Sequence, residues 1–306
     1  SRWSFCPCGG LLWRPPQADG EDQRAIRAAT AALAAEGTLS PRLVGRSQKI
    51  RGFASQLGCD VPQEWIFVVG ELAQDSTVSA MIGNPSSWTR CGRNTSTWHA
   101  AALRAGYVDA CVAGAGCPTA LVLRAALRVI GLAPGCRTLS SSFLMLLPDG
   151  RELTFSDCAV VPDPSSEQLA DIAAATAATH QALTGEQAKV AMLSFSTRGG
   201  AVRPHVDKVK SGMGILRIRP LVPQIGASKA PDSAVAGHAN VLNFPTLNAA
   251  NIGYKITERP GGAVALGPIL QGLAAPMNDL SRGRRAEDMF SMGLLSAMQS
   301  LAVQPA

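Results

Sequence analysis

A short apolar strand that runs directly into a helix decides the fold class. It lies in residues 107–130, which read YVDACVAGAGCPTALVLRAALRVI. The first nine residues are mostly apolar, Gly114 and Gly116 end the run, and Pro118 suits the first turn of a helix. Small apolar residues on both elements favour helices packed on a parallel sheet. We therefore predict that this stretch is one strand–helix unit of an α/β fold.

The same alternation continues on both sides of this stretch. Apolar residues at helical spacing predict helices over residues 21–37, 48–57, 247–259 and 283–301. Apolar runs predict strands over residues 42–45, 66–72, 189–195, 240–244 and 263–266. Strand–helix–strand repetition with short connections indicates mostly parallel, doubly wound sheets.

The middle of the chain has a different pattern. Residues 138–147 and 152–161 read as two strands joined by Pro148-Asp149-Gly150, which predicts an antiparallel hairpin. A capping box then opens a helix at Ser165. We therefore expect two α/β/α domains with a cleft between them. Domain I comprises residues 1–135 and 268–306, and domain II, with the hairpin, comprises residues 136–267.

The composition narrows the functional classes. The 306 residues are 46% apolar and 16% charged, and this apolar fraction is enough for a sizeable core. The sequence contains no run of about 18 apolar residues, so we expect no membrane-spanning helix. The net charge of +6 comes from scattered basic residues that do not interleave with aromatics. It is compatible with an ordinary basic protein first and with an anionic small-molecule ligand second, and we expect no nucleic acid as a partner. The eight cysteines form no CxxC pair, which indicates a reducing, cytoplasmic compartment and no zinc ribbon.

Hydroxyls, glycines and basic residues gather in two predicted strand-to-helix loops. Ser194, Ser196 and Thr197 lie at the end of a predicted strand and precede two glycines, a combination that can hold a phosphate. Asn251 lies in a second loop-and-helix segment that ends at Arg259, four residues after Lys255, which makes a candidate anion clamp. An ordinary polar turn and a solvated basic helix face remain the alternatives.

The third candidate segment leads into the last predicted helix. Ser281 and Arg282 stand at the helix N-terminus, where free N–H groups favour anions, and the guanidinium matches a phosphate. Asp288 follows Ser281 by two helical turns and so shares its face. This set suits acyl or phosphoryl transfer, and an ordinary N-cap with a surface aspartate is the alternative.

Three segments together resemble a known family. They are residues 191–200, AMLSFSTRGG; residues 229–251, KAPDSAVAGHANVLNFPTLNAAN; and residues 267–288, GPILQGLAAPMNDLSRGRRAED. They are similar to the phosphate acetyltransferases, of the phosphate acetyl/butyryltransferase family. The resemblance implies the reaction acetyl-CoA + phosphate ⇌ acetyl phosphate + CoA, in a cytoplasmic enzyme of acetate metabolism. It also implies a homodimer, and no metal or redox cofactor, CoA being a substrate.

The resemblance also implies roles for single residues. Ser281, Arg282 and Asp288 match the active-site serine, arginine and aspartate of the family, and Arg124 and Arg259 match substrate-binding arginines. In the implied mechanism Asp288 takes the proton of the CoA thiol and the thiolate attacks the acetyl carbonyl in a ternary complex. Ser281 and Arg282 stabilise the developing charge.

Three stretches depart from the family pattern: residues 1–17, 76–98 and 205–224. Arg284 also stands where the family commonly has cysteine. These departures leave open a second hypothesis, an acyl-CoA-binding protein of the same fold with impaired or no turnover. A phosphate butyryltransferase is a third, because the sequence does not fix the size of the acyl pocket.

Overall fold

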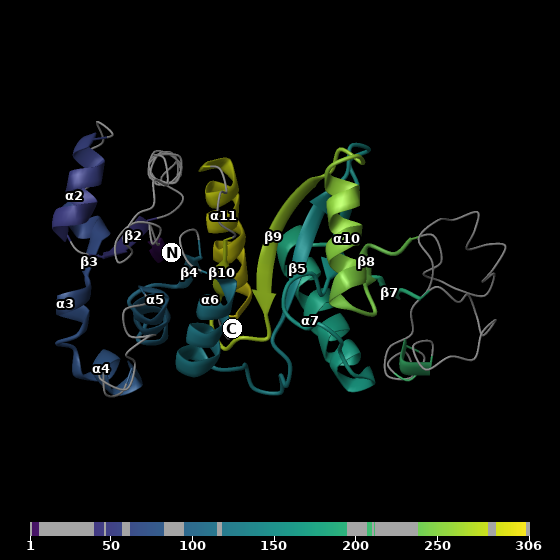
Figure 1. Ribbon diagram of the computed structural model, residues 1–306, viewed down its shortest axis with the longest axis horizontal. Helices are drawn as coiled ribbons and strands as arrows, with labels where there is room; N and C mark the ends of the chain where they lie inside the picture. The colour runs from purple at the N-terminus through teal and green to yellow at the C-terminus, as the bar shows by residue number, and fades with distance from the viewer. Residues whose placement is uncertain are drawn as a thin grey trace. The chain divides into compact units, whose positions relative to one another are not determined.

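The chain forms two compact units (Figure 1). The computed structural model describes residues 2–5, 40–45, 47–56, 62–82, 95–114, 118–194, 207–209, 211, 238–280 and 286–303. The first unit comprises Ser1–Ala133 and Leu273–Ala306, and the second comprises Pro134–Gly272. The chain therefore leaves the first unit once and returns to it near its end.

The first unit is built on a parallel sheet with the strand order β10-β4-β1-β2-β3. Its strands are β1 (Arg2–Phe5), β2 (Ser40–Gly45), β3 (Ile66–Val68), β4 (Ala110–Ala113) and β10 (Met277–Asp279). Every residue of β4 is buried, as expected for an inner strand of a parallel sheet. β10 comes from the C-terminal part of the chain and pairs with β4, so the sheet joins the two ends of this unit.

Helices connect and cover these strands. They are α2 (Ser47–Gln56), the short η1 (Gln63–Trp65), α3 (Val69–Leu72), α4 (Ser76–Ile82), α5 (Thr95–Arg104), α6 (Thr119–Ala125) and α11 (Ala286–Val303). A π-helical turn, η3 (Ala126–Ile130), continues α6 and ends at Gly131, whose N–H donates to Ala126 O. Gly131 has φ 78°, a left-handed conformation that suits glycine.

The second unit contains a mixed sheet with the strand order β7-β8-β6-β5-β9. The strands are β5 (Ser140–Leu146), β6 (Glu152–Ser156), β7 (Val190–Met192), β8 (Val241–Asn243) and β9 (Val264–Gln271). β7, β8 and β6 run parallel, whereas β5 is antiparallel to both β6 and β9. β9 is one continuous strand through residue 271, so residues 268–272 belong to this unit.

Two helices, α7 (Ser166–Thr184) and α10 (Leu247–Glu258), pack on opposite faces of this sheet (Figure 1). Thr154 of β6 contacts His180 of α7, with 2.9 Å between Oγ1 and Nδ1. Phe143 of β5, one position out of register with Thr154, stacks on Tyr254 of α10 at 4.3 Å between ring centroids. Because side chains alternate along a strand, the two contacts lie on different faces. Burial lowers the pKa of His180, so its imidazole is neutral at pH 7.

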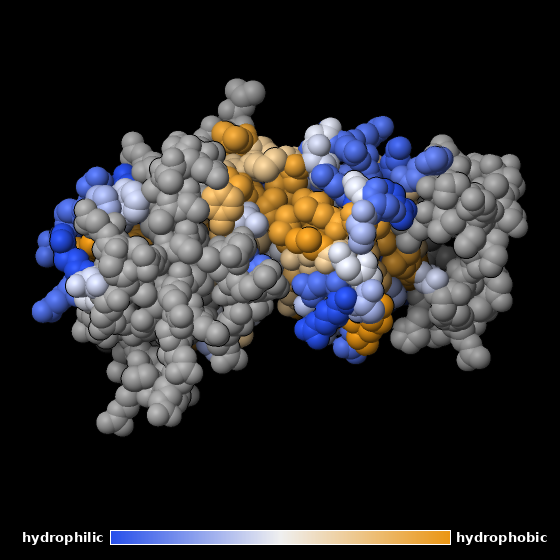
Figure 2. All heavy atoms as spheres, turned by 90° about the horizontal axis from the view of Figure 1, so that it is seen from above, coloured by the Kyte–Doolittle hydropathy of each residue, from blue (hydrophilic) through white to orange (hydrophobic). Residues whose placement is uncertain are grey.

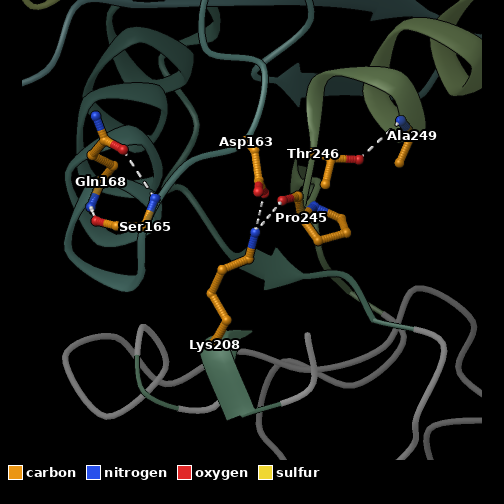
Figure 3. A network of polar contacts seen from close by, with 7 residues as sticks. All are labelled: Asp163, Ser165, Gln168, Lys208, Pro245, Thr246 and Ala249. Carbon is orange, nitrogen blue, oxygen red and sulfur yellow. Dashed lines mark hydrogen bonds and ion pairs between the residues drawn. The ribbon is translucent and has the colours of Figure 1, made fainter. Parts of the chain in front are cut away.

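Side chains fix the starts of both helices (Figure 3). The Ser165 hydroxyl accepts from Gln168 N while Gln168 Oε1 accepts from Ser165 N, which completes the capping box of α7. Thr246 caps α10 by accepting from Ala249 N. Lys208 Nζ reaches the loops in front of both helices, at 2.6 Å from Asp163 Oδ1 and 3.3 Å from Pro245 O. This ammonium therefore connects the loop after β6 to the loop after β8, at the carboxyl ends of these two parallel strands.

The predicted α/β class, the mostly parallel sheets and the hairpin are confirmed. The prediction of a seven-residue strand over residues 66–72 is wrong, because the strand stops at Val68 and α3 follows at once. β9 is longer than the predicted residues 263–266. The predicted helix over residues 21–37 lies outside the described residues. Among the helices that the structure describes, none is both long and apolar enough to cross a membrane.

Candidate active site

The candidate site in the first unit is built around the ends of β4 and β10. Leu280 N, just after β10, donates to Ala113 O at 2.6 Å, so the two strand ends are held together. Gly114 follows β4 with φ 106°, a conformation that an L side chain rarely adopts. A Cβ there would overlap Asp279 Oδ1 and lie 2.6 Å from Leu280 O. Only glycine at position 114 lets the end of β4 lie so close to Asp279 and Leu280.

Asp279 is the charged group of this junction. It is 0% exposed, and its Oδ2 accepts from the Thr119 hydroxyl, in the first turn of α6, at 2.5 Å. Its Oδ1 has no hydrogen-bond partner among the described residues. Burial raises the pKa of Asp279 to about 6, although the Thr119 hydroxyl and the Leu280 N–H both lower it. At pH 7 and above, the carboxylate is therefore mostly ionised despite its burial.

The raised pKa has a consequence for stability. The folded chain holds this proton more tightly than the unfolded chain, because the pKa of Asp279 moves from 3.8 to about 6 on folding. The stabilising contribution is complete below pH 3.8 and is lost as the pH rises to about 6. At neutral pH the ionised Asp279 thus costs stability, as groups retained for function often do.

Asn278, the residue before Asp279, points to the other face of the sheet. Its Nδ2 donates to Ser296 Oγ and to Gln299 Oε1 of α11, each at 2.6 Å. Asp288 precedes Ser296 on α11 and stands in the first turn of that helix. The Asp288 residue is half-buried. Asn278 and Asp279 together therefore connect the end of β10 to both α11 and α6.

The other candidate residues in the first unit and at the end of α10 are exposed. Arg124 is in the last turn of α6, two residues before the start of the π-helical turn, and it has interactions within the chain. Arg259 is the C-cap of α10, where its N–H donates to Lys255 O. Both guanidinium-bearing residues are thus accessible to an anion.

The remaining predicted residues are only partly described. Ser194 is exposed, lies two residues after the end of β7 and has an interaction within the chain. Asn251 Nδ2 donates to Cys158 O at 3.1 Å, so this amide joins α10 to the loop after β6. Ser196, Thr197, Ser281 and Arg282 lie outside the described residues. Within the described part of the chain, no cluster of His, Cys, Asp or Glu is arranged to hold a metal ion.

Comparison with known proteins identifies similar sequences and structures. Residues 17–297 match the family described as "Phosphate acetyl/butaryl transferase". The phosphate acetyltransferase of Clostridium acetobutylicum is 39% identical, over 92% of this chain and 93% of that protein. The phosphate acetyltransferase of Staphylococcus epidermidis is 34% identical over the same shares of the two chains. The crystal structure of a phosphotransacetylase from Streptococcus pyogenes superposes with a TM-score of 0.85, at 35% identity, over 98% of this chain and 94% of that one.

Proposed function

This chain belongs to the phosphate acetyl/butaryl transferase family, and we propose that it transfers an acetyl group between CoA and inorganic phosphate. The observation that carries the proposal is the match over residues 17–297, together with identity of 34–39% over nearly the whole length of two phosphate acetyltransferases. The α/β fold of both units agrees with that of the similar phosphotransacetylase structure.

In the proposed site, Asp288, Ser281 and Arg282 act on the reacting groups. Three observations support this: Asp288 is half-buried, it stands in the first turn of α11, and α11 is bonded to the strand that leads to Ser281. Arg124 and Arg259, both exposed, are proposed to hold phosphate groups, with Ser194, Ser196, Thr197 and Asn251 contributing to substrate binding. The Asn251 amide would do so only if it released Cys158 O or bound beside it.

The proposed chemistry is direct transfer between the two substrates. Asp288 accepts the proton of the CoA thiol, and the thiolate sulfur forms a bond to the carbonyl carbon of acetyl phosphate. The bond between that carbon and the phosphate oxygen then breaks, and phosphate leaves. Ser281 and Arg282 donate to the oxygen that becomes negative in between. In the reverse direction, phosphate attacks acetyl-CoA and the thiolate leaves with the proton of Asp288.

The test is release of CoA from acetyl-CoA, followed with a thiol reagent. We expect release that requires inorganic phosphate and that produces one acetyl phosphate for each CoA. Binding of CoA without release would contradict the proposal and leave the acyl-CoA-binding protein. Higher kcat/KM with butyryl-CoA than with acetyl-CoA would instead identify a phosphate butyryltransferase.

A homodimer is part of the proposal. Hydrophobic side chains, in orange, are exposed on the face that Figure 2 draws. Ile252 and Ile256, one turn apart on α10, are 59% and 58% exposed. We expect light scattering of the wild type to give twice the molar mass of the chain. The double variant Ile252→Asp/Ile256→Asp should give the molar mass of one chain. The equally exposed Leu301→Asp is the control, and a wild-type mass equal to one chain would contradict the dimer.

We also propose that the enzyme works in the cytoplasm, with CoA as a substrate and without a bound metal or redox group. Support for a reducing compartment comes from Cys136 and Cys158, which form no disulfide within the described part of the chain. Activity that survives dialysis against a chelator would support the metal-free reaction, and loss restored by a divalent cation would contradict it.

A further inference from the structure

Asp279 is a buried carboxylate that the proposed chemistry does not use. An ionised group in the interior is expensive unless it is paired, and the described groups that stabilise this carboxylate, the Thr119 hydroxyl and the Leu280 N–H, are both neutral. No cation bonded to Asp279 is present in the described residues. A neutral residue at this position would fill the same space without the free-energy cost of burying a charge. We therefore look for a functional role of the carboxylate.

The position of Asp279 indicates such a role. Its neighbour Leu280 is bonded to Ala113 O, and Ser281 follows directly. Its Oδ2 is bonded to Thr119 at the start of α6, the helix that carries Arg124 in its last turn. Asn278, on its other side, is bonded to α11, the helix that begins beside Asp288. The segments that carry Ser281, Arg124 and Asp288 therefore all connect to one dipeptide.

We infer that Asp279 is a positioning residue of the acyl-transfer site: its carboxylate holds the start of α6 and the segment leading to Ser281 and Arg282 in a fixed relation. The inference rests on the proposed function. A charge-assisted hydrogen bond is about twice as strong as a neutral one, which favours a carboxylate over an amide as the acceptor for Thr119. The overlap of any side chain at Gly114 with Asp279 Oδ1 shows how closely the carboxylate fills this junction.

The first test replaces Asp279 by asparagine in the full chain. We expect kcat to fall about 100-fold, the loss typical of a displacement of about 1 Å in a catalytic group, while the KM values change little. The midpoint of thermal unfolding at pH 8 should stay the same or rise, because the amide carries no buried charge. Glu71→Gln, an exposed acid of the same unit, is the control and should match the wild type.

Two outcomes would overturn the inference. One is wild-type kcat in Asp279→Asn, and the other is a fall in kcat accompanied by a lower unfolding midpoint, which a merely structural role would produce. Should Asp279→Asn fail to fold, Thr119→Val removes the same hydrogen bond from the α6 side with little change in shape. Its kcat should fall, and Thr119→Ser, which restores the hydroxyl, should recover it. Equal kcat in all three Thr119 forms would also overturn the inference.

A measurement without turnover separates this inference from the proposed function. Amide hydrogen exchange in peptides covering residues 114–120 and 280–288 should be at least about threefold faster in Asp279→Asn than in the wild type, because local opening reports local anchoring. Peptides of the second unit should be unchanged. An inactive wild type with this exchange pattern would refute the proposed function and leave the anchoring role of Asp279 intact. Unchanged exchange would refute that role.

Discussion

Asp288→Asn is expected to lower kcat for acetyl transfer by about 10²–10⁴-fold, the range for loss of a general base. The amide has nearly the shape of the carboxylate but cannot accept the proton of the CoA thiol. Thiolate is the reactive form of the thiol, so the attack on acetyl phosphate slows in proportion. The half-buried position of Asp288 in the first turn of α11 is that of a group that can meet a substrate.

The measurement is kcat and KM for both substrates, with the unfolding midpoint recorded alongside. Glu167→Gln is a matched control, because Glu167 is an acid in the first turn of α7 in the other unit. It should retain wild-type kcat. If Asp288→Asn also retains it, Asp288 is not the base, and another group or the solvent must take the proton.

The largest effect on stability is expected from Asp157→Ala, at about 4 kcal/mol of unfolding free energy, since two buried and three half-buried donors lose their acceptor together. Asp157 is 3% exposed, and burial raises its pKa. Its Oδ1 accepts from the N–H and hydroxyl of Ser141, from Ala159 N at 3.1 Å and from Val160 N at 3.2 Å. Its Oδ2 accepts from Val161 N at 2.7 Å.

Chemical unfolding at pH 7 would measure this loss. Asp157→Asn should be intermediate, because one amide oxygen remains while the NH₂ group faces the N–H of Val161. Asp149→Ala is the control: Asp149 is exposed, and its ion pair with Arg151, at 2.8 Å, is of the solvent-screened kind that contributes little to stability. Equal losses in Asp157→Ala and Asp149→Ala would mean that the five hydrogen bonds of Asp157 do not stabilise the fold.

Long or strongly patterned elements could be predicted from the sequence, and short ones could not. The hairpin of β5 and β6 has a run of apolar residues on each side of a Pro-Asp-Gly turn, and the capping box marks the start of α7. β10 was missed because three residues, Met277–Asp279, carry no periodicity. It is a strand only because β4, far away in the sequence, offers it a partner.

The sequence predicted which residues could form the candidate site, but not which of their side chains contact one another. The hydroxyl, the guanidinium and the helix N-terminus of the segment Asn278–Gly283 predict a site there, whereas no sequence pattern identifies Asp279 as part of it. What distinguishes Asp279 is its burial and its bond to Thr119, 160 positions earlier in the chain, and no local pattern encodes either. Asn251, by contrast, was predicted as a substrate-binding residue. Its amide donates to Cys158 O, a contact that the polar sequence around Asn251 does not predict.

The late return of the chain to the first unit determines the order of events on the ribosome. β10 pairs with β4 but lies beyond the whole of the second unit in sequence, so that unit emerges while the first still lacks a strand. Until residues 277–279 are made, the backbone groups of β4 that β10 will pair are unoccupied, and such an edge invites association with other nascent chains. For this topology, the hazardous interval of biosynthesis is the time taken to translate residues 134–276.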